Sequence, residues 1–209
     1  MIVPDLPGFK EETALKEIWN LDSYVSWVKK LTEENIGGKF FLMGHSFGGR
    51  VAIKFSIKYP ELLSGLILCD AAGVTYRPKI KIRFFARLTQ LGSLIFSLPG
   101  LKVLRPWAKK FVYFLIGTYD YRFIQNPLMK ETFKKVVAED LRSFLPQIKS
   151  PTLIIWGERD RMTPLDNAYL LKKEIKNSRL EVLKNLSHVS YQEDPMKISE
   201  LVTNFVRSE

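Results

Sequence analysis

One serine of the chain lies in a glycine-rich stretch, GHSFGG, at residues 44–49. The short apolar run before it, residues 39–43, predicts a β-strand, and residues 49–59 predict a helix. A serine at such a junction is either part of an ordinary turn or an enzyme nucleophile. The second interpretation requires a base that takes the hydroxyl proton and N–H donors that stabilise an oxyanion.

The spacing of the glycines favours the nucleophile. G-x-S-x-G between a strand and a helix is typical of a sharp turn that lifts the serine out of the sheet. We expect side chains in place of Gly44 and Gly48 to crowd this turn. Because the turn begins a helix, the backbone N–H of Phe47 can point at a developing negative charge. We therefore interpret Ser46 as the nucleophile and Phe47 as an oxyanion-hole donor.

Only two histidines are available as the base that would activate Ser46. His45 lies inside the turn, and we expect its side chain to point away from Ser46. His188 lies in the stretch VLKNLSHVSYQEDP, directly after a predicted strand at residues 180–183. We therefore predict that His188 is the base.

Two aspartates compete for the third role, the acid that orients the histidine. Asp160 lies in a polar loop, GERDRMTP, that follows the predicted strand 151–156. Asp70 follows the predicted strand 64–69, so it also lies at the carboxyl end of a strand. We expect the acid between the serine and the histidine in the chain, an order that both aspartates satisfy. We favour Asp160, in its polar loop at the same edge of the sheet as Ser46, and keep Asp70 as the alternative. Three other acidic residues are interpreted as loop and helix-cap residues: Glu158, Glu193 and Asp194.

Strands and helices alternate along the chain. The predicted strands are residues 2–4, 39–43, 64–69, 151–156 and 180–183. The predicted helices are residues 12–34, 49–59, 167–175 and 196–206. Since the strands are continuous apolar runs, the pattern predicts an α/β fold with a mostly parallel sheet covered by helices on both faces.

Residues 74–140 interrupt this alternation. We predict one domain over residues 1–209, with a core at 1–73 and 141–209 and a helical lid at 74–140. Thirteen Lys and Arg but only four Asp and Glu lie between Arg77 and Asp140, which accounts for most of the net charge of +10. An apolar stripe in the lid has helical spacing: Ile80, Phe84, Leu88, Leu91, Ile95 and Leu98. We interpret the basic residues as a solvated surface; contact with anionic lipid or an acidic acyl carrier is the alternative.

Composition excludes several other classes of function. The single cysteine, Cys69, cannot form an internal disulfide, and with two histidines it is too few for a structural zinc site. We find no nucleic-acid-binding motif and expect no cofactor. The opening residues lack a secretory leader, and no run approaches the roughly 20 apolar residues of a membrane span. We therefore expect a cytoplasmic protein.

Four stretches together resemble the α/β-hydrolase superfamily, in its carboxylesterase-like branch: VPDLPGF, GHSFGG, GERDRMTP and SHVSYQEDP. The resemblance implies acyl transfer on a small-molecule ester with a small or medium apolar acyl group. Ser46 would attack the carbonyl, His188 would accept and return the proton, and Asp160 would hold the imidazole. Carbon–carbon bond hydrolases of this superfamily use the same three residues, so cleavage of a C–C bond remains an alternative.

The resemblance also implies three earlier strands and a His-Gly loop with a second oxyanion donor, which we do not find before Ile2. Loss of one such donor typically lowers the rate about 10²–10³-fold. We expect Met1 to be an internal methionine and the 209 residues alone to have weak activity. An inactive or incomplete hydrolase-fold protein is the alternative.

Overall fold

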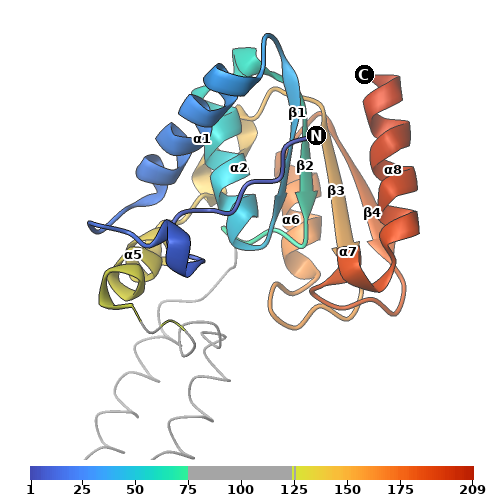
Figure 1. Cartoon of the computed structure of the whole chain (residues 1–209). Helices are drawn as coiled ribbons and strands as arrows, with labels where there is room; N and C mark the ends of the chain where they lie inside the picture. The colour runs from blue at the N-terminus through green and yellow to red at the C-terminus, as the bar shows by residue number, and fades with distance from the viewer. Residues whose placement is uncertain (75–123, 125) are drawn as a thin grey trace, which may run out of the picture.

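The structure is a computed structural model that describes residues 1–74, 124 and 126–209. Within these ranges, a parallel sheet of four strands in the order β1-β2-β3-β4 forms the centre (Figure 1). The strands are β1 (Phe40–His45), β2 (Leu63–Cys69), β3 (Thr152–Gly157) and β4 (Ser178–Leu183). All three strand pairs are parallel, so the carboxyl ends of the strands lie along one edge.

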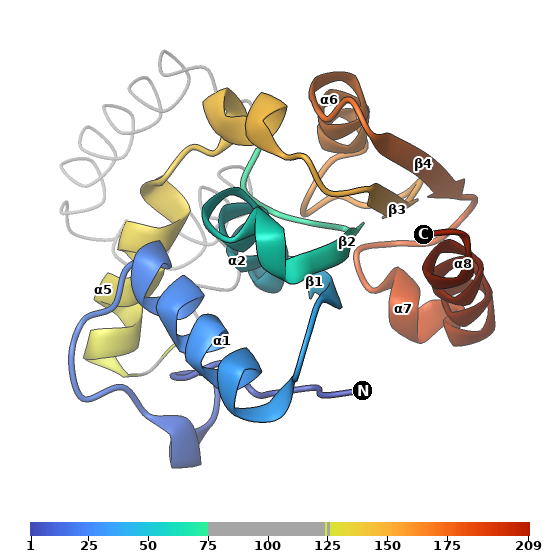
Figure 2. The ribbon, with the colours of Figure 1, turned by 90° about the horizontal axis from the view of Figure 1, so that it is seen from above.

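Helices cover both faces of the sheet (Figure 2). The α-helices are α1 (Leu21–Asn35), α2 (Phe47–Lys58), α5 (Pro127–Ala138), α6 (Asp166–Glu174), α7 (Ser190–Glu193) and α8 (Pro195–Ser208). Three short 3-10 helices complete the described elements: η1 (Glu11–Thr13), η2 (Pro60–Leu62) and η5 (Arg142–Gln147). The predicted α/β class with a parallel sheet is confirmed.

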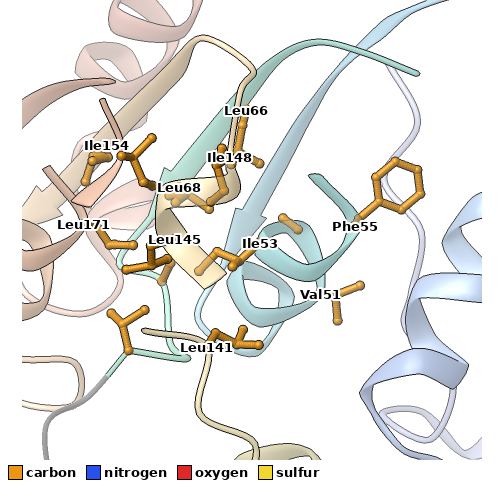
Figure 3. Close-up of a cluster of buried hydrophobic side chains, with 14 of the residues drawn as sticks. Val51, Ile53, Phe55, Leu66, Leu68, Leu141, Leu145, Ile148, Ile154 and Leu171 are labelled. Carbon is orange, nitrogen blue, oxygen red and sulfur yellow. The ribbon is translucent and has the colours of Figure 1, made fainter. Parts of the chain in front are cut away.

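Alternation along the strands divides the core into two clusters. Leu66 and Ile154 face α2 and α6 in the larger cluster, part of which is drawn in Figure 3. Their neighbours Ile67 and Leu153 face the opposite side, where they pack with Phe205 of α8. Both faces of β2 and β3 are therefore buried from solvent, which explains why these strands are continuous apolar runs.

Two predicted elements differ at the amino-terminal end. The described residues 1–6 form no strand, so the strand predicted at residues 2–4 is wrong; Pro4 has no N–H to donate, and residues 1–5 are exposed. The helix predicted at 12–34 begins only at Leu21. Asn20 precedes it and accepts a hydrogen bond from the Ser23 N–H at 2.9 Å, so a capping residue within the apolar pattern sets the start.

The predicted lid falls largely outside the described residues. The apolar stripe between Ile80 and Leu98 is among the residues that the structure does not describe. The described part, α5, lies beyond the carboxyl ends of the strands (Figure 1). The buried Arg50 of α2 holds the end of this helix, because its Nη1 donates to the carbonyls of Val136 at 3.1 Å and Glu139 at 2.8 Å.

The outer edge of β1 borders no further strand within the described ranges. Met43 of this strand is 42% exposed. Among these same residues, the helices are too short or too polar to cross a membrane.

Candidate active site

Ser46 occupies a strained turn between β1 and α2. Its φ is +48°, in the left-handed region that residues other than glycine seldom adopt. A Cβ on Gly44 would lie 2.5 Å from the Gly48 carbonyl oxygen, and one on Gly49 would lie 2.4 Å from the Ala71 Cβ. Both glycines are therefore required for the close approach of the backbone.

The expectation that a side chain at Gly48 would crowd the turn is wrong. A Cβ at this position meets no described atom within 4 Å. The physical reason is direction: the Gly48 Cα faces the pocket above the turn, whose lining includes Gly48, whereas Gly49 faces the sheet. Gly49, rather than Gly48, is the glycine that lies against the backbone just after β2.

Ser46, His188 and Asp160 form a continuous chain of hydrogen bonds. The Oγ of Ser46 lies 2.9 Å from Nε2 of His188, and Nδ1 of His188 lies 2.8 Å from Oδ2 of Asp160. With the proton on Nδ1, the imidazole donates to the carboxylate and its Nε2 is free to accept from the serine hydroxyl. The structure thus brings the three predicted residues together, although 142 positions separate Ser46 from His188.

Asp160 is a carboxylate whose oxygens are all engaged. Its Oδ1 accepts hydrogen bonds from the backbone N–H groups of Met162 at 2.8 Å and Thr163 at 2.9 Å, and its Oδ2 accepts one from the Thr163 hydroxyl at 2.6 Å. Burial acts to raise the pKa of Asp160, but hydrogen bonds from His188 and Thr163 outweigh it and hold this pKa below its usual value. Asp160 is therefore an anion at neutral pH, as an acid that steadies an imidazolium must be.

Asp70, the alternative acid, has different partners. It is fully buried, and its carboxylate accepts hydrogen bonds from the Ser190 hydroxyl at 2.6 Å and the Gly157 N–H at 2.8 Å. Burial raises the pKa of Asp70 above its usual value. Asp70 thus links β2 to the end of β3 and to α7, while Asp160 makes the contact with His188.

Thr163 and Ser190 are two neighbours of the site that sequence reasoning missed. Thr163 follows Asp160 by three positions, the spacing at which an aspartate carboxylate commonly accepts from a backbone N–H, so this signal was present in GERDRMTP. Ser190 follows His188 by two positions, but nothing in its local sequence indicates that it faces Asp70. That contact depends on how the end of β2 and the segment between β4 and α7 meet in space.

A pocket of about 900 Å³ opens at Ser46. Three aromatic rings are part of its wall: the Phe9 and Phe47 rings meet edge to face at 4.9 Å, and Phe47 and Phe133 stack at 6.0 Å. Three charged residues also line it: Asp5, Lys10 and Glu11. Met129 of α5 also lines it. The aromatic and aliphatic part of the described wall suits an apolar group placed beside the serine.

Phe47 is the first residue of α2. The N–H groups of a first helical turn have no acceptor within the helix, which leaves the Phe47 N–H suited to an oxyanion. Across the described ranges, no three His, Cys, Asp or Glu side chains group as a metal site. Burial raises the pKa of the Cys69 thiol to about 12, so this neighbour of Asp70 stays a thiol.

Comparison with known proteins agrees with this architecture. A family model described as "Serine aminopeptidase, S33" matches residues 20–195. The monoacylglycerol lipase ABHD6 of Rattus norvegicus is 33% identical over 231 aligned residues, which cover all of this chain and 67% of the relative.

Solved structures share the fold. A thermophilic esterase from Thermogutta terrifontis superposes with a TM-score of 0.67 at 24% identity, over 98% of this chain and 78% of that one. A meta-cleavage product hydrolase from Pseudomonas fluorescens gives a TM-score of 0.66 at 20% identity, over 98% and 78%. With the family model covering most of the chain, these likenesses place the protein: it belongs to the serine aminopeptidase family of the α/β-hydrolase superfamily and is a hydrolase.

Proposed function

We propose that the protein hydrolyses carboxylic esters of small or medium apolar acyl groups through an acyl-enzyme on Ser46. One observation carries the proposal. The chain of hydrogen bonds that runs from Asp160 through His188 ends at Ser46, which lines the pocket. The rings of Phe9, Phe47 and Phe133 in the same wall offer surface against which an apolar acyl group can pack.

The reaction follows from the contacts of each group. As Ser46 Oγ attacks the ester carbonyl, its proton passes to Nε2 of His188 and the carbonyl oxygen becomes an oxyanion beside the Phe47 N–H. Asp160 stabilises the imidazolium through the 2.8 Å contact with Nδ1. His188 then protonates the departing alkoxide, and a water activated in the same way releases the acid from Ser46.

The acyl group is proposed from the pocket and from the relatives. Phe9, Phe47 and Phe133 offer ring surfaces against which an alkyl chain can pack. Asp5, Lys10 and Glu11 also line the pocket. The rat relative is named a monoacylglycerol lipase, and one structural neighbour is an esterase. Esters of glycerol with a single acyl chain are therefore the first substrates to test.

A substrate panel tests the proposal. p-Nitrophenyl esters from acetate to laurate, a monoacylglycerol, a ring-cleavage dienoate and a prolyl anilide are compared, with Ser46→Ala as the blank. We expect turnover of the esters with kcat/KM rising from acetate to a medium chain, and none with Ser46→Ala. Turnover of the dienoate or the anilide without any ester would refute the proposal and favour C–C hydrolase or aminopeptidase chemistry.

A further inference from the structure

His45 precedes the nucleophile, and its side chain reaches the main chain of the base. Its Nε2 lies 2.7 Å from the backbone carbonyl oxygen of His188. We infer that His45 is a positioning residue: its Nε2–H donates to this carbonyl and thereby holds the His188 imidazole in place against Ser46. The inference rests on the proposed function, because it assigns His45 a part in the reaction of Ser46.

Two consecutive residues of one turn thus contact the two ends of the same histidine. His45 bonds the main chain of His188, and Ser46 bonds its ring at 2.9 Å. His188 lies between β4 and α7, outside any helix or strand, so no regular backbone ladder fixes its position. A hydrogen bond from a rigid strand end is therefore a direct way to locate it.

Packing restricts the ring of His45 to this contact. Its centroid lies 4.9 Å from that of the His188 ring and 4.7 Å from that of the Tyr191 ring. Tyr191 belongs to α7, which follows His188 directly. The imidazole of His45 therefore contacts the rings of both His188 and Tyr191, and a rotation of its ring would disturb these contacts.

The charge state of His45 suits a donor that must not repel the base. Burial lowers the pKa of His45, so its ring is neutral at pH 7. A neutral ring can donate from only one nitrogen, and the carbonyl of His188 selects the Nε2–H tautomer. No second positive charge then opposes the imidazolium that forms on His188.

Three substitutions separate the hydrogen bond from the shape of the ring. His45→Phe keeps an aromatic ring beside those of His188 and Tyr191 but removes the donor. His45→Gln places an amide N–H near the position of Nε2, and His45→Asn carries the same amide on a side chain too short to reach the carbonyl. The Gln and Asn pair decides the question even if His45→Phe does not fold.

We expect His45→Phe and His45→Asn to lower kcat about 10- to 100-fold with KM within about twofold, the size expected when a catalytic group is displaced by up to 1 Å. His45→Gln should recover most of the loss. Equal kcat in all variants, or equal losses in Gln and Asn, would overturn the inference.

A second measurement does not depend on turnover. Two-dimensional ¹⁵N NMR of the histidine-labelled chain at pH 7 should show His45 as the neutral Nε2–H tautomer. An Nδ1–H tautomer would overturn the inference even in an active enzyme. If the unmodified chain hydrolyses no ester, the proposed function fails, while the tautomer still reports on the contact with His188.

Discussion

At the scale of single residues, two buried carboxylates lie at the same sheet edge and differ in electrostatics. Hydrogen bonds hold the pKa of Asp160 below its usual value against the effect of burial, whereas burial raises the pKa of Asp70. The lowered pKa means that Asp160 stabilises the fold above about pH 4 and that this contribution is lost as pH falls through its folded pKa. For Asp70 the folded state binds a proton more readily than the unfolded chain, so stability falls as pH rises from about 4 through the raised pKa.

We predict opposite pH slopes for the two Asn variants. The free energy of unfolding of the unmodified chain minus that of Asp160→Asn should grow as pH rises from about 3 to 5. The same difference against Asp70→Asn should shrink as pH rises above about 4. Urea unfolding at half-unit pH steps measures both, and slopes of the same sign would contradict these assignments.

The sequence predicted the three interacting residues and favoured Asp160 over Asp70, but the strand pattern alone placed both aspartates at the same edge. Asp70 and Asp160 both follow buried strands, and that is all a strand pattern reveals. The difference arises from the turn in which Thr163 donates to Asp160, and from Ser190, which faces Asp70. The first contact is local to the turn, whereas the second depends on the meeting of segments 120 positions apart.

At the scale of elements, the start of α2 depends on one close approach. Gly49 lies so near the backbone after β2 that an added Cβ would be 2.8 Å from the Ala71 Cα, which is backbone and cannot rotate away. A Cβ added to Gly48 would meet no described atom within 4 Å. Alanine substitutions at these two neighbouring glycines therefore form a matched pair of variants, one with the close contact and one without it.

We predict that Gly49→Ala lowers the free energy of unfolding by about 1–3 kcal/mol, the usual cost of overpacking. Gly48→Ala should leave it unchanged or raise it by up to about 1 kcal/mol, because alanine suits a helix better than glycine. Thermal unfolding of both variants tests this. Similar melting temperatures for the two would show that the turn between β1 and α2 does not depend on the contact with Ala71.

Element types were predicted more reliably than their ends. β2, β3 and α2 lie within two residues of their predicted bounds, because buried apolar runs and Pro60 mark them clearly. The start of α1 was misplaced because apolar spacing continues before Asn20, where the cap decides. The strand at residues 2–4 was wrong because an apolar pair before a proline does not require a partner strand.

At the scale of the whole molecule, parallel strand order explains how distant residues meet. β1, β2, β3 and β4 all end at one edge, so the segments after them carry Ser46, Asp70, Asp160 and His188 to the same place. This convergence was predictable from the alternation of strands and helices. The lid was predicted only as helical and basic. Most of it, residues 75–123, is not among the residues that the structure describes.

The most direct test of the account is covalent labelling of Ser46. A fluorophosphonate reacts only with a serine whose proton a neighbouring base removes, so it reports the activation that the Ser46–His188–Asp160 chain provides. The account predicts a single modified residue, Ser46, identified by peptide mass spectrometry, with labelling abolished in Ser46→Ala and reduced at least about 10³-fold in His188→Ala. Labelling that survives Ser46→Ala, or that proceeds equally without His188, would contradict it.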